Sequence, residues 1–336
     1  MLTNRQSLIL KVIVEDFIQS AEPVGSKTLM TKYELPYSSA TIRNEMMLLE
    51  EKGLIEKTHT SSGRVPSTLG YRYYVENLMN VELNDHERYE LQTVFRDERG
   101  SMDDVIQKSC DVLSHMTSLT SIVLGPDAKS QRLQHIKMFP VDEHTAVAVF
   151  ITNQGHTENK TFHFDDSVSV DDITNCCNIL NDRLVGTQLS EVVDKMNEIK
   201  PILANQVKRH EALFNAFIQA FRRFASDHMY YSGATNMLYQ PEFADIEKLR
   251  NVMRMLEDEQ LVREIARRGQ STLLKAGNKS ELIWVDDMAV VSTSFRVNDT
   301  EEGKLMVVGP SRMNYDRVTS MLDFIGEILE QKYYKK

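Results

Sequence analysis

Residues 38–74 read SSATIRNEMMLLEEKGLIEKTHTSSGRVPSTLGYRYY and decide the fold of the N-terminal part of the chain. Ser38 or Ser39 can cap a helix, because a hydroxyl oxygen accepts from the free amides of the first turn. The apolar face of that helix consists of Ile42, Met46 and Leu49. Gly53 ends the helix, and a short strand, a polar turn and a second strand follow. The stretch therefore predicts a helix followed by a β-hairpin.

The opposite face of this helix has the side chains that a major groove of DNA requires. They are short or form hydrogen bonds: Ala40, Thr41, Arg43, Asn44 and Met47. Asparagine can bond adenine through two hydrogen bonds, and arginine can do the same with guanine. The amides of the first turn, close to Ser38 and Ser39, favour a phosphate. An ordinary surface helix with solvated polar groups is the alternative that this face alone leaves open.

The residues before this helix predict two more helices. Thr3 and Gln6 have the spacing of a capping box, which starts a helix over residues 3–20. Ser26 can cap a short second helix over residues 26–33. A long helix, a short helix and a third helix after a tight turn are typical of the helix-turn-helix core.

The residues after Gly53 complete the pattern of a winged helix-turn-helix. Residues 54–57 and 65–67 suit the two strands of a wing, with the turn at 61–63. Arg64 is expected at the hairpin tip, within reach of a phosphate or the minor groove. Three cations are predicted to contact phosphates: Lys27, Arg64 and Arg72. Base contacts are assigned to Arg43 and Asn44.

The charge distribution limits how such a head could bind. The 336 residues carry a net charge of −10, which is unusual for a DNA-binding protein. Residues 1–75 hold 9 Lys and Arg against 8 Asp and Glu, so the acidity belongs to the rest of the chain. Affinity for DNA would then depend on a dimer and on the local placement of cations.

Three segments resemble the family of the heat-inducible transcription repressor HrcA. They are SSATIRNEM (38–46), GLIEKTHTSSGRVPSTLGYRYYV (53–75) and VVGPSRMNY (307–315). The resemblance extends, more loosely, through the middle of the chain. It implies a repressor of chaperone genes that binds an inverted-repeat operator in double-stranded DNA as a homodimer. It also implies that a chaperonin supports the active form and that heating relieves repression.

The rest of the chain predicts an α+β multidomain protein. Strand patterns lie at 120–124, 135–140, 146–152, 159–164, 282–285, 289–296 and 304–308, and a helical pattern runs from 170 to 268. Strands, then helices, then strands indicate one sheet domain interrupted by a mostly helical insertion. The resemblance implies that these are a GAF-like α/β domain and an inserted dimerisation domain.

These patterns give a set of predicted domain limits. They are a winged-helix domain over 1–78, a linker over 79–101, a GAF-like domain over 102–169 and 245–336, and an insertion over 170–244.

Four phenylalanines in the insertion have heptad-like spacing: Phe214, Phe217, Phe221 and Phe224. One interpretation is the core of their own domain, where apolar stripes usually pack. The other is a subunit interface, in which aromatic residues are enriched. The position of the seam in the insertion and the family resemblance favour a contribution to the homodimer.

Motifs for catalysis, cofactors and metals are missing from the sequence. It has no glycine-rich phosphate loop of the P-loop or dinucleotide type, and no H-E-x-x-H or paired C-x-x-C. The three cysteines, Cys110, Cys176 and Cys177, suit a reducing compartment. We therefore expect no catalytic residue, no metal and no cofactor.

No apolar run approaches the length of a membrane span, so a cytoplasmic, soluble protein is expected. An alternative function is a metabolite-responsive winged-helix regulator with a small-molecule site in the GAF-like domain. It predicts an enclosed pocket with convergent polar groups. A second alternative is a winged-helix module used for protein contacts. It predicts no salt-dependent, sequence-specific affinity for DNA.

Overall fold

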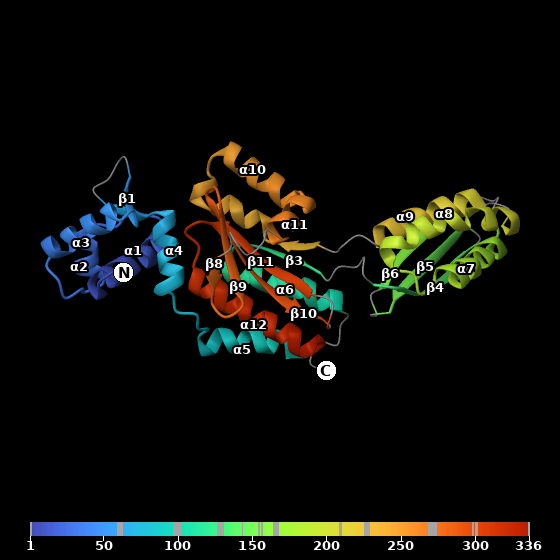
Figure 1. Ribbon diagram of the computed structural model, residues 1–336, viewed down its shortest axis with the longest axis horizontal. Coiled ribbons are helices and arrows are strands. Elements are labelled where there is room, and N and C mark those ends of the chain that lie inside the picture. Colours follow the sequence, from blue (N-terminus) through green and yellow to red (C-terminus); the bar gives the residue numbers. More distant parts are fainter. Residues whose placement is uncertain are drawn as a thin grey trace. The chain divides into compact units, whose positions relative to one another are not determined.

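The chain forms two compact units in the computed structural model. The structure describes residues 2–58, 63–96, 102–125, 131–142, 144–153, 155, 157–163, 168–207, 210–224, 229–267, 274–297, 299 and 302–334. The first unit combines Met1–Leu124 with Met229–Lys336, and the second, the inserted unit, is Gly125–His228 (Figure 1). The second unit starts and ends earlier in the chain than the predicted insertion at 170–244.

Four helices and a hairpin form the N-terminal part of the first unit, which we call the head. Its elements are α1 (Asn4–Ser20), α2 (Ser26–Lys32), α3 (Ser39–Glu51), β1 (Ile55–Lys57), β2 (Arg64–Pro66) and α4 (Thr68–Asn77). Thr3 and Gln6 form the expected capping box. The strands pair antiparallel, with Glu56 opposite Val65. The expected order of three helices and two strands is confirmed, while the turn residues 59–62 lie outside the described part.

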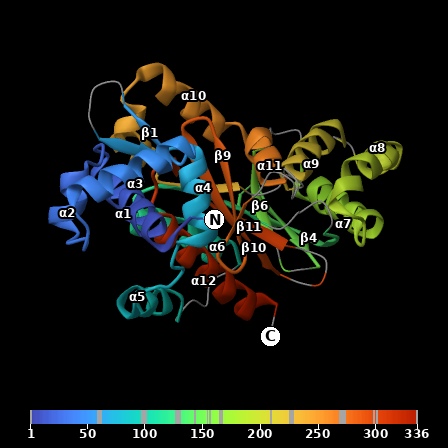
Figure 2. The ribbon, with the colours of Figure 1, turned by 60° about the vertical axis from the view of Figure 1, so that its left-hand side comes forward.

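A close contact joins α4 to the start of the hairpin. A side-chain carbon on Gly70 would lie 2.0 Å from the carbonyl oxygen of Leu54, so only glycine permits this approach. The neighbouring residues Tyr71 and Tyr74 are buried. In Figure 2, α4 lies next to the strands of the central sheet, and its contacts there are with β8 (Leu274–Ala276).

Among the described residues, six strands form the central antiparallel sheet of the first unit, in the order β7-β3-β11-β10-β9-β8. The other bounds are β3 (Thr120–Leu124), β7 (Met229–Ser232), β9 (Ser280–Val285), β10 (Met288–Arg296) and β11 (Glu302–Pro310). One face packs on α6 (Met102–Thr117) and α12 (Tyr315–Tyr333). The other packs on α10 (Ile246–Glu257) and α11 (Glu259–Arg267). Two short 3-10 helices, Ala234–Tyr239 and Pro241–Phe243, precede α10.

The segment predicted as a linker contains a packed helix. Residues Asp85–Arg96 form α5, whose Leu91 and Phe95 are buried in the core shared with α6 and α12. The guanidinium carbon of Arg88 lies 5.3 Å from the centroid of the Phe324 ring, within the roughly 6 Å over which a cation is attracted to an aromatic face. The polar composition of this stretch concealed two apolar positions four residues apart, which are enough to attach one face of a helix.

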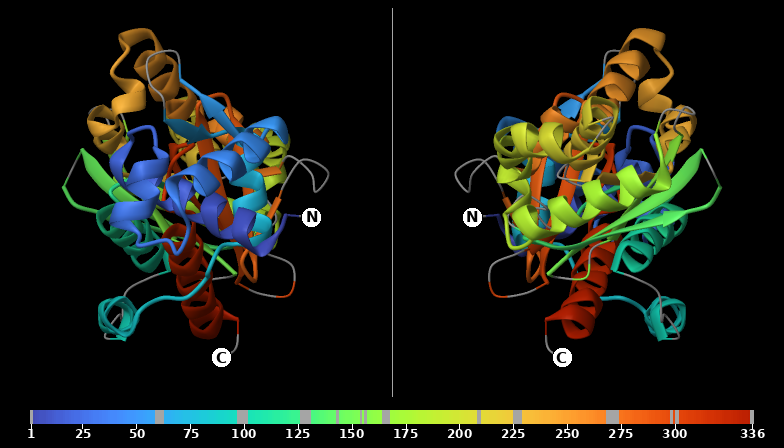
Figure 3. Two further views of the ribbon diagram at one scale, coloured as in Figure 1. Left: turned by 90° about the vertical axis from the view of Figure 1, so that its left-hand side faces the viewer. Right: turned by 90° about the vertical axis from the view of Figure 1, so that its right-hand side faces the viewer.

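The inserted unit is a three-stranded sheet covered by three helices among its described residues. Its elements are β4 (Leu133–Pro140), β5 (Thr145–Thr152), β6 (Thr157–His163), α7 (Val170–Leu184), α8 (Leu189–Gln206) and α9 (His210–Phe224). The strands pair in the order β4-β5-β6, and Figure 3 (right) shows the helices on one side of them. These strands were predicted in the GAF-like domain, but strand periodicity does not tell which sheet a strand joins.

The aromatic seam packs inside the inserted unit, so its assignment to a subunit interface is corrected. Phe214, Phe217 and Phe221 are buried in the core beneath the sheet. Phe150 on β5 contacts two of them, with ring centroids 6.2 Å from Phe217 and 5.0 Å from Phe221. The side chain of Phe224 lies outside the described part. Heptad spacing therefore indicates an apolar face here, not the partner that covers it.

Replacing Phe221 with alanine should destabilise the inserted unit by about 3–5 kcal/mol, because the cavity replaces a fully buried ring. Phe221 is 1% exposed, whereas the control Phe139 is 52% exposed. Phe139→Ala should change the free energy of unfolding by about 0.5 kcal/mol or less. Urea unfolding followed by circular dichroism measures both effects. The fluorescence of Trp284, which lies in the first unit, should keep its own transition; equal costs for the two variants would contradict the assignment.

Candidate nucleic-acid interface

The position of α3 in the head determines which of its side chains meet solvent. Ser38 caps the helix by accepting from the amide of Thr41 at 3.1 Å. Ile42, Met46 and Leu49 are buried, as predicted, and α3 packs against α1 and α2. The exposed side chains of the opposite face include Ala40, Arg43, Asn44 and Met47. The polar face of the helix is therefore free to meet a partner.

A basic groove lies between the start of α2, α3 and the hairpin. Its volume is about 520 Å³, and it is lined by Gly25, Ser26, Lys27, Arg43, Met46, Lys57 and Arg64. Four of these residues are cations, and each comes from a different element. Lys57 was not singled out from the sequence, although its position in a predicted strand of the hairpin was an available signal. The groove brings together three of the predicted site residues, which are Lys27, Arg43 and Arg64.

Only some of the groove cations are free to bind an anion. Glu50 on α3 forms ion pairs with Arg64 at 2.8 Å and with Lys57 at 3.6 Å. In the part of the chain that the structure describes, Lys27 and Arg43 form no ion pair, and both are exposed. These two side chains therefore carry the unbalanced positive charge of the groove.

Arg64 lies at the start of β2 and not at a free hairpin tip. Its backbone exchanges hydrogen bonds with Val24, at 2.8 and 2.9 Å. Its Nε and Nη2 donate to Glu50 Oε2 at 2.9 and 2.8 Å, and its side chain is 15% exposed. The prediction of a tip cation is thus wrong in position, because the backbone bridge to Val24 draws Arg64 into the head.

The other predicted site residues do not line the groove. Ser39 contacts Ser26 on α2, with 3.1 Å between the hydroxyl oxygens. Thr41 is half-buried beside the cap. Arg72 on α4 is exposed and pairs with Glu76 at 3.2 Å. Lys32, another cation of the head, is bound to Asp16, and that hydrogen bond raises the pKa of its ammonium group.

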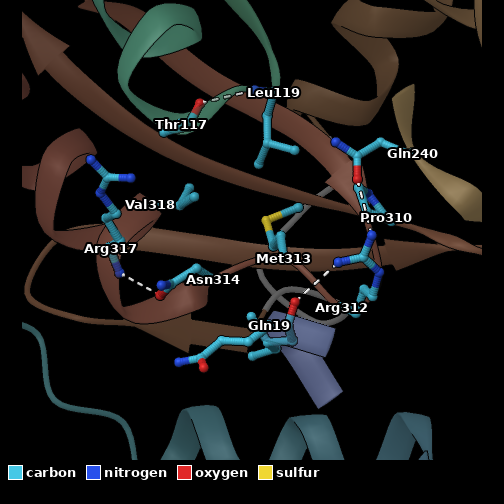
Figure 4. A pocket seen from close by; sticks show the side chains of 11 residues that line it. Gln19, Thr117, Leu119, Gln240, Pro310, Arg312, Met313, Asn314, Arg317 and Val318 are labelled. Carbon is cyan, nitrogen blue, oxygen red and sulfur yellow. Dashed lines mark hydrogen bonds between the residues drawn. The ribbon is translucent and has the colours of Figure 1, made fainter. Parts of the chain in front are cut away.

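The described residues contain neither a metal cluster nor a helix that could span a membrane. No group of three His, Cys, Asp or Glu side chains there could hold a metal ion. No described helix has the length and apolar character to cross a bilayer. An open hollow of about 250 Å³ adjoins Arg312 and Asn314 in the first unit (Figure 4). It is smaller than the usual small-molecule site of about 300–1,000 Å³. A second open hollow, of about 800 Å³, is lined mostly by residues of α5 and α6 and falls within that range.

Comparison with known proteins identifies the class. The family model "HrcA protein C terminal domain" matches residues 103–319. The heat-inducible transcription repressor HrcA of Bacillus pumilus (strain SAFR-032) is 40% identical, with 98% of this chain and 97% of that protein covered. The protein of the same name from Lysinibacillus sphaericus is 39% identical, with 100% and 99% covered. The matching relatives are transcription repressors. This chain belongs to the HrcA family.

A solved structure shares the fold along the whole chain. The crystal structure of a hypothetical protein at 2.2 Å resolution aligns with a TM-score of 0.70 at 19% identity. The alignment covers 99% of both chains. The mixed α and β architecture described above therefore has an experimental counterpart.

Replacing Arg64 with alanine should destabilise the head by about 2 kcal/mol, because two charge-assisted hydrogen bonds are lost and Glu50 keeps only one partner. Lys57→Ala is the matched control, since Lys57 pairs with the same carboxylate but is 63% exposed. Its cost should be about 0.5 kcal/mol. Amide hydrogen exchange of the head measures both. If the two substitutions cost the same, Arg64 does not support the fold.

Proposed function

We propose that this chain represses chaperone genes by binding an inverted-repeat operator in double-stranded DNA as a homodimer. The observation that carries the proposal is the exposed polar face of α3 beside a groove with four cations. Family membership supports the class of repressor. In this proposal the head is a winged helix-turn-helix, α3 is its recognition helix, and β1 and β2 are the wing.

The recognition helix would enter the major groove with its N-terminal half. Ala40 leaves room for close approach, while Arg43 and Asn44 extend toward base edges. Asn44 would bond adenine and Arg43 would bond guanine, as these side chains do in other major-groove complexes. Met47, exposed one turn further along, offers an apolar contact to a thymine methyl group.

Phosphate contacts would come from the rim of the basic groove. Lys27 and Lys57 are exposed on either side of α3, and Ser38 marks the amide end of that helix. Ser39 and Thr41 lie in the same first turn, and Arg72 supplies a more distant cation. Arg64, which is held by Glu50, would orient the wing and add positive potential to the groove.

The small net charge of the head is a reason to propose a dimer, because one head alone would bind DNA weakly. With 9 cations against 8 carboxylates in residues 1–75, one head makes a small electrostatic contribution. Two heads related by a two-fold axis would bind two half-sites of an inverted repeat. We propose that the central sheet is a GAF-like domain and that the inserted unit serves dimerisation. Its aromatic seam then supports the interface by holding the unit's core.

Control by heat is the last part of the proposal. The chain would lose its DNA-competent conformation on heating and recover it with the help of a chaperonin. The relatives' name, heat-inducible transcription repressor, supports this control. A mobility-shift titration on an inverted-repeat operator, before and after heating and with or without chaperonin, tests it. Equal recovery of binding with and without chaperonin would remove the chaperonin from the proposal.

Asn44→Ala should reduce the preference for the operator over its point variants by about 1–3 kcal/mol, because the two bonds to one base are lost. Lys27→Ala should weaken binding to all sequences alike and reduce the slope of log affinity against log salt by about 1. Lys52→Ala is the control, because it removes the same charge from an exposed residue that does not line the groove. Unchanged operator binding in the Asn44→Ala and Lys27→Ala variants would contradict the proposed interface.

A further inference from the structure

Two sequence segments that lie far apart in the chain meet in the first unit. One is the GYRYYV stretch, which forms much of α4. The other is the GPSRMNY stretch, which leads from β11 into α12. The proposed base contacts of α3 involve neither of them, and only Arg72 in the first is proposed to contact a phosphate. Three residues at the start of α12 contact the head, namely Arg312, Tyr315 and Asp316. We call these three residues the seat.

Arg312 connects the seat to the end of α1 through a hydrogen bond. Its Nη1 donates to the carbonyl oxygen of Ile18 at 3.0 Å. Its Nη2 donates to Gln240 Oε1 at 3.3 Å, and its Nε donates to Glu242. The side chain is 15% exposed, and Figure 4 shows it pointing between Gln240 and the end of α1 at Gln19. A guanidinium held on three sides in this way has a fixed direction.

Asp316 accepts hydrogen bonds from α4 and from the residues that follow it. The hydroxyl of Tyr74 donates to Asp316 Oδ2 at 2.6 Å, and the amide of Asn80 donates to Oδ1 at 3.2 Å. Tyr74 is almost fully buried, and its hydroxyl also lies 3.4 Å from Glu15 Oε1 on α1. Burial raises the pKa of the Asp316 carboxyl above its usual range. The contact is therefore largely withdrawn from water.

Tyr315 adds an aromatic contact between the same two elements. Its ring lies 5.7 Å from the ring of Tyr71 on α4, in a tilted arrangement. Trp284 on β9 donates to the Tyr315 hydroxyl at 3.0 Å and so joins the ring to the central sheet. The head is thus held at α1 and at α4 by side chains with defined partners on both sides.

We propose that the seat positions the head for operator binding, so that the two heads of a dimer fit one half-site spacing. This inference rests on the proposed function. A head on a free hinge would lose rotational freedom when it binds, and it would accept half-sites at many spacings. A held head avoids most of that loss and concentrates the second head at one spacing. The three seat residues are positioning residues, since none of them contacts DNA in this proposal.

The decisive variant combines Tyr74→Phe, which removes the bond to Asp316 and keeps the ring, with Arg312→Gln, which removes the bond to Ile18 together with those to Gln240 and Glu242. Binding is measured on the operator, on a version with half a helical turn added between the half-sites, and on a single half-site. The variant should lose about 10-fold in affinity for the operator and keep its affinity for the single half-site. Its discrimination against the altered spacing should shrink. A merely structural role would weaken all three DNAs together.

Arg317→Gln is the matched control. Arg317 lies one residue after the seat and pairs with Glu87 on α5, and it forms no ion pair with a described residue of the head. This variant should behave as the wild type on all three DNAs. If the Tyr74→Phe, Arg312→Gln variant keeps the affinity and the spacing preference of the wild type, the proposed role of the seat is wrong.

A second measurement separates the seat from the proposed function. Spin labels at Lys52→Cys on the head and Glu327→Cys on α12 report the distance between the two without any DNA; both positions are exposed, and the three native cysteines are buried. The wild type should give a narrow distance distribution and the Tyr74→Phe, Arg312→Gln variant a broad one. Identical distance distributions in the wild type and the variant would contradict the proposed role of the seat. A wild-type protein with a narrow distribution and no affinity for inverted repeats would overturn the proposed function alone.

Discussion

The rest of the head depends on the burial of one apolar stripe of α3. Ile42, Met46 and Leu49 lie in a core shared with α1, and burying such side chains stabilises by roughly 1.5–3 kcal/mol each. Rotation of the helix about its axis would expose all three, so the orientation of the helix is fixed. The outward direction of Arg43 and Asn44 is a consequence of that packing. The chemistry of the outer face is thus set by the inner one.

Charge is arranged on the head more selectively than its total indicates. Glu50 binds Lys57 and Arg64, and several other cations pair with carboxylates on the same or a neighbouring helix. Within the described residues this leaves Lys27 and Arg43 unpaired in the basic groove. In the proposed function, a nearly neutral head would attract DNA weakly at long range, so its contacts would act at short range. In the proposed dimer, fixed geometry between the two heads would then matter more than net charge.

Local patterns in the sequence predicted most of the secondary structure but not its assembly. The capping box at Thr3, the cap at Ser38 and the stripe on α3 were read correctly, because each depends on residues within one or two turns. The strands β4–β6 were assigned to the wrong sheet, since alternation is the same in any half-buried strand. The seam around Phe217 had an apolar face whose partner, Phe150, lies far away in sequence.

The sequence by itself determined the helices and hairpin of the head, the exposed face of α3 and the resemblance to the repressor family. Tertiary structure alone decided that Arg64 is bound to Glu50 and bridged to Val24, and that Lys57 joins the groove. It also decided that Tyr74 meets Asp316, two residues from segments at opposite ends of the chain. The physical reason is the range of the interactions. Caps and periodicity act between near neighbours, whereas ion pairs and buried hydrogen bonds form only where packing brings distant segments together.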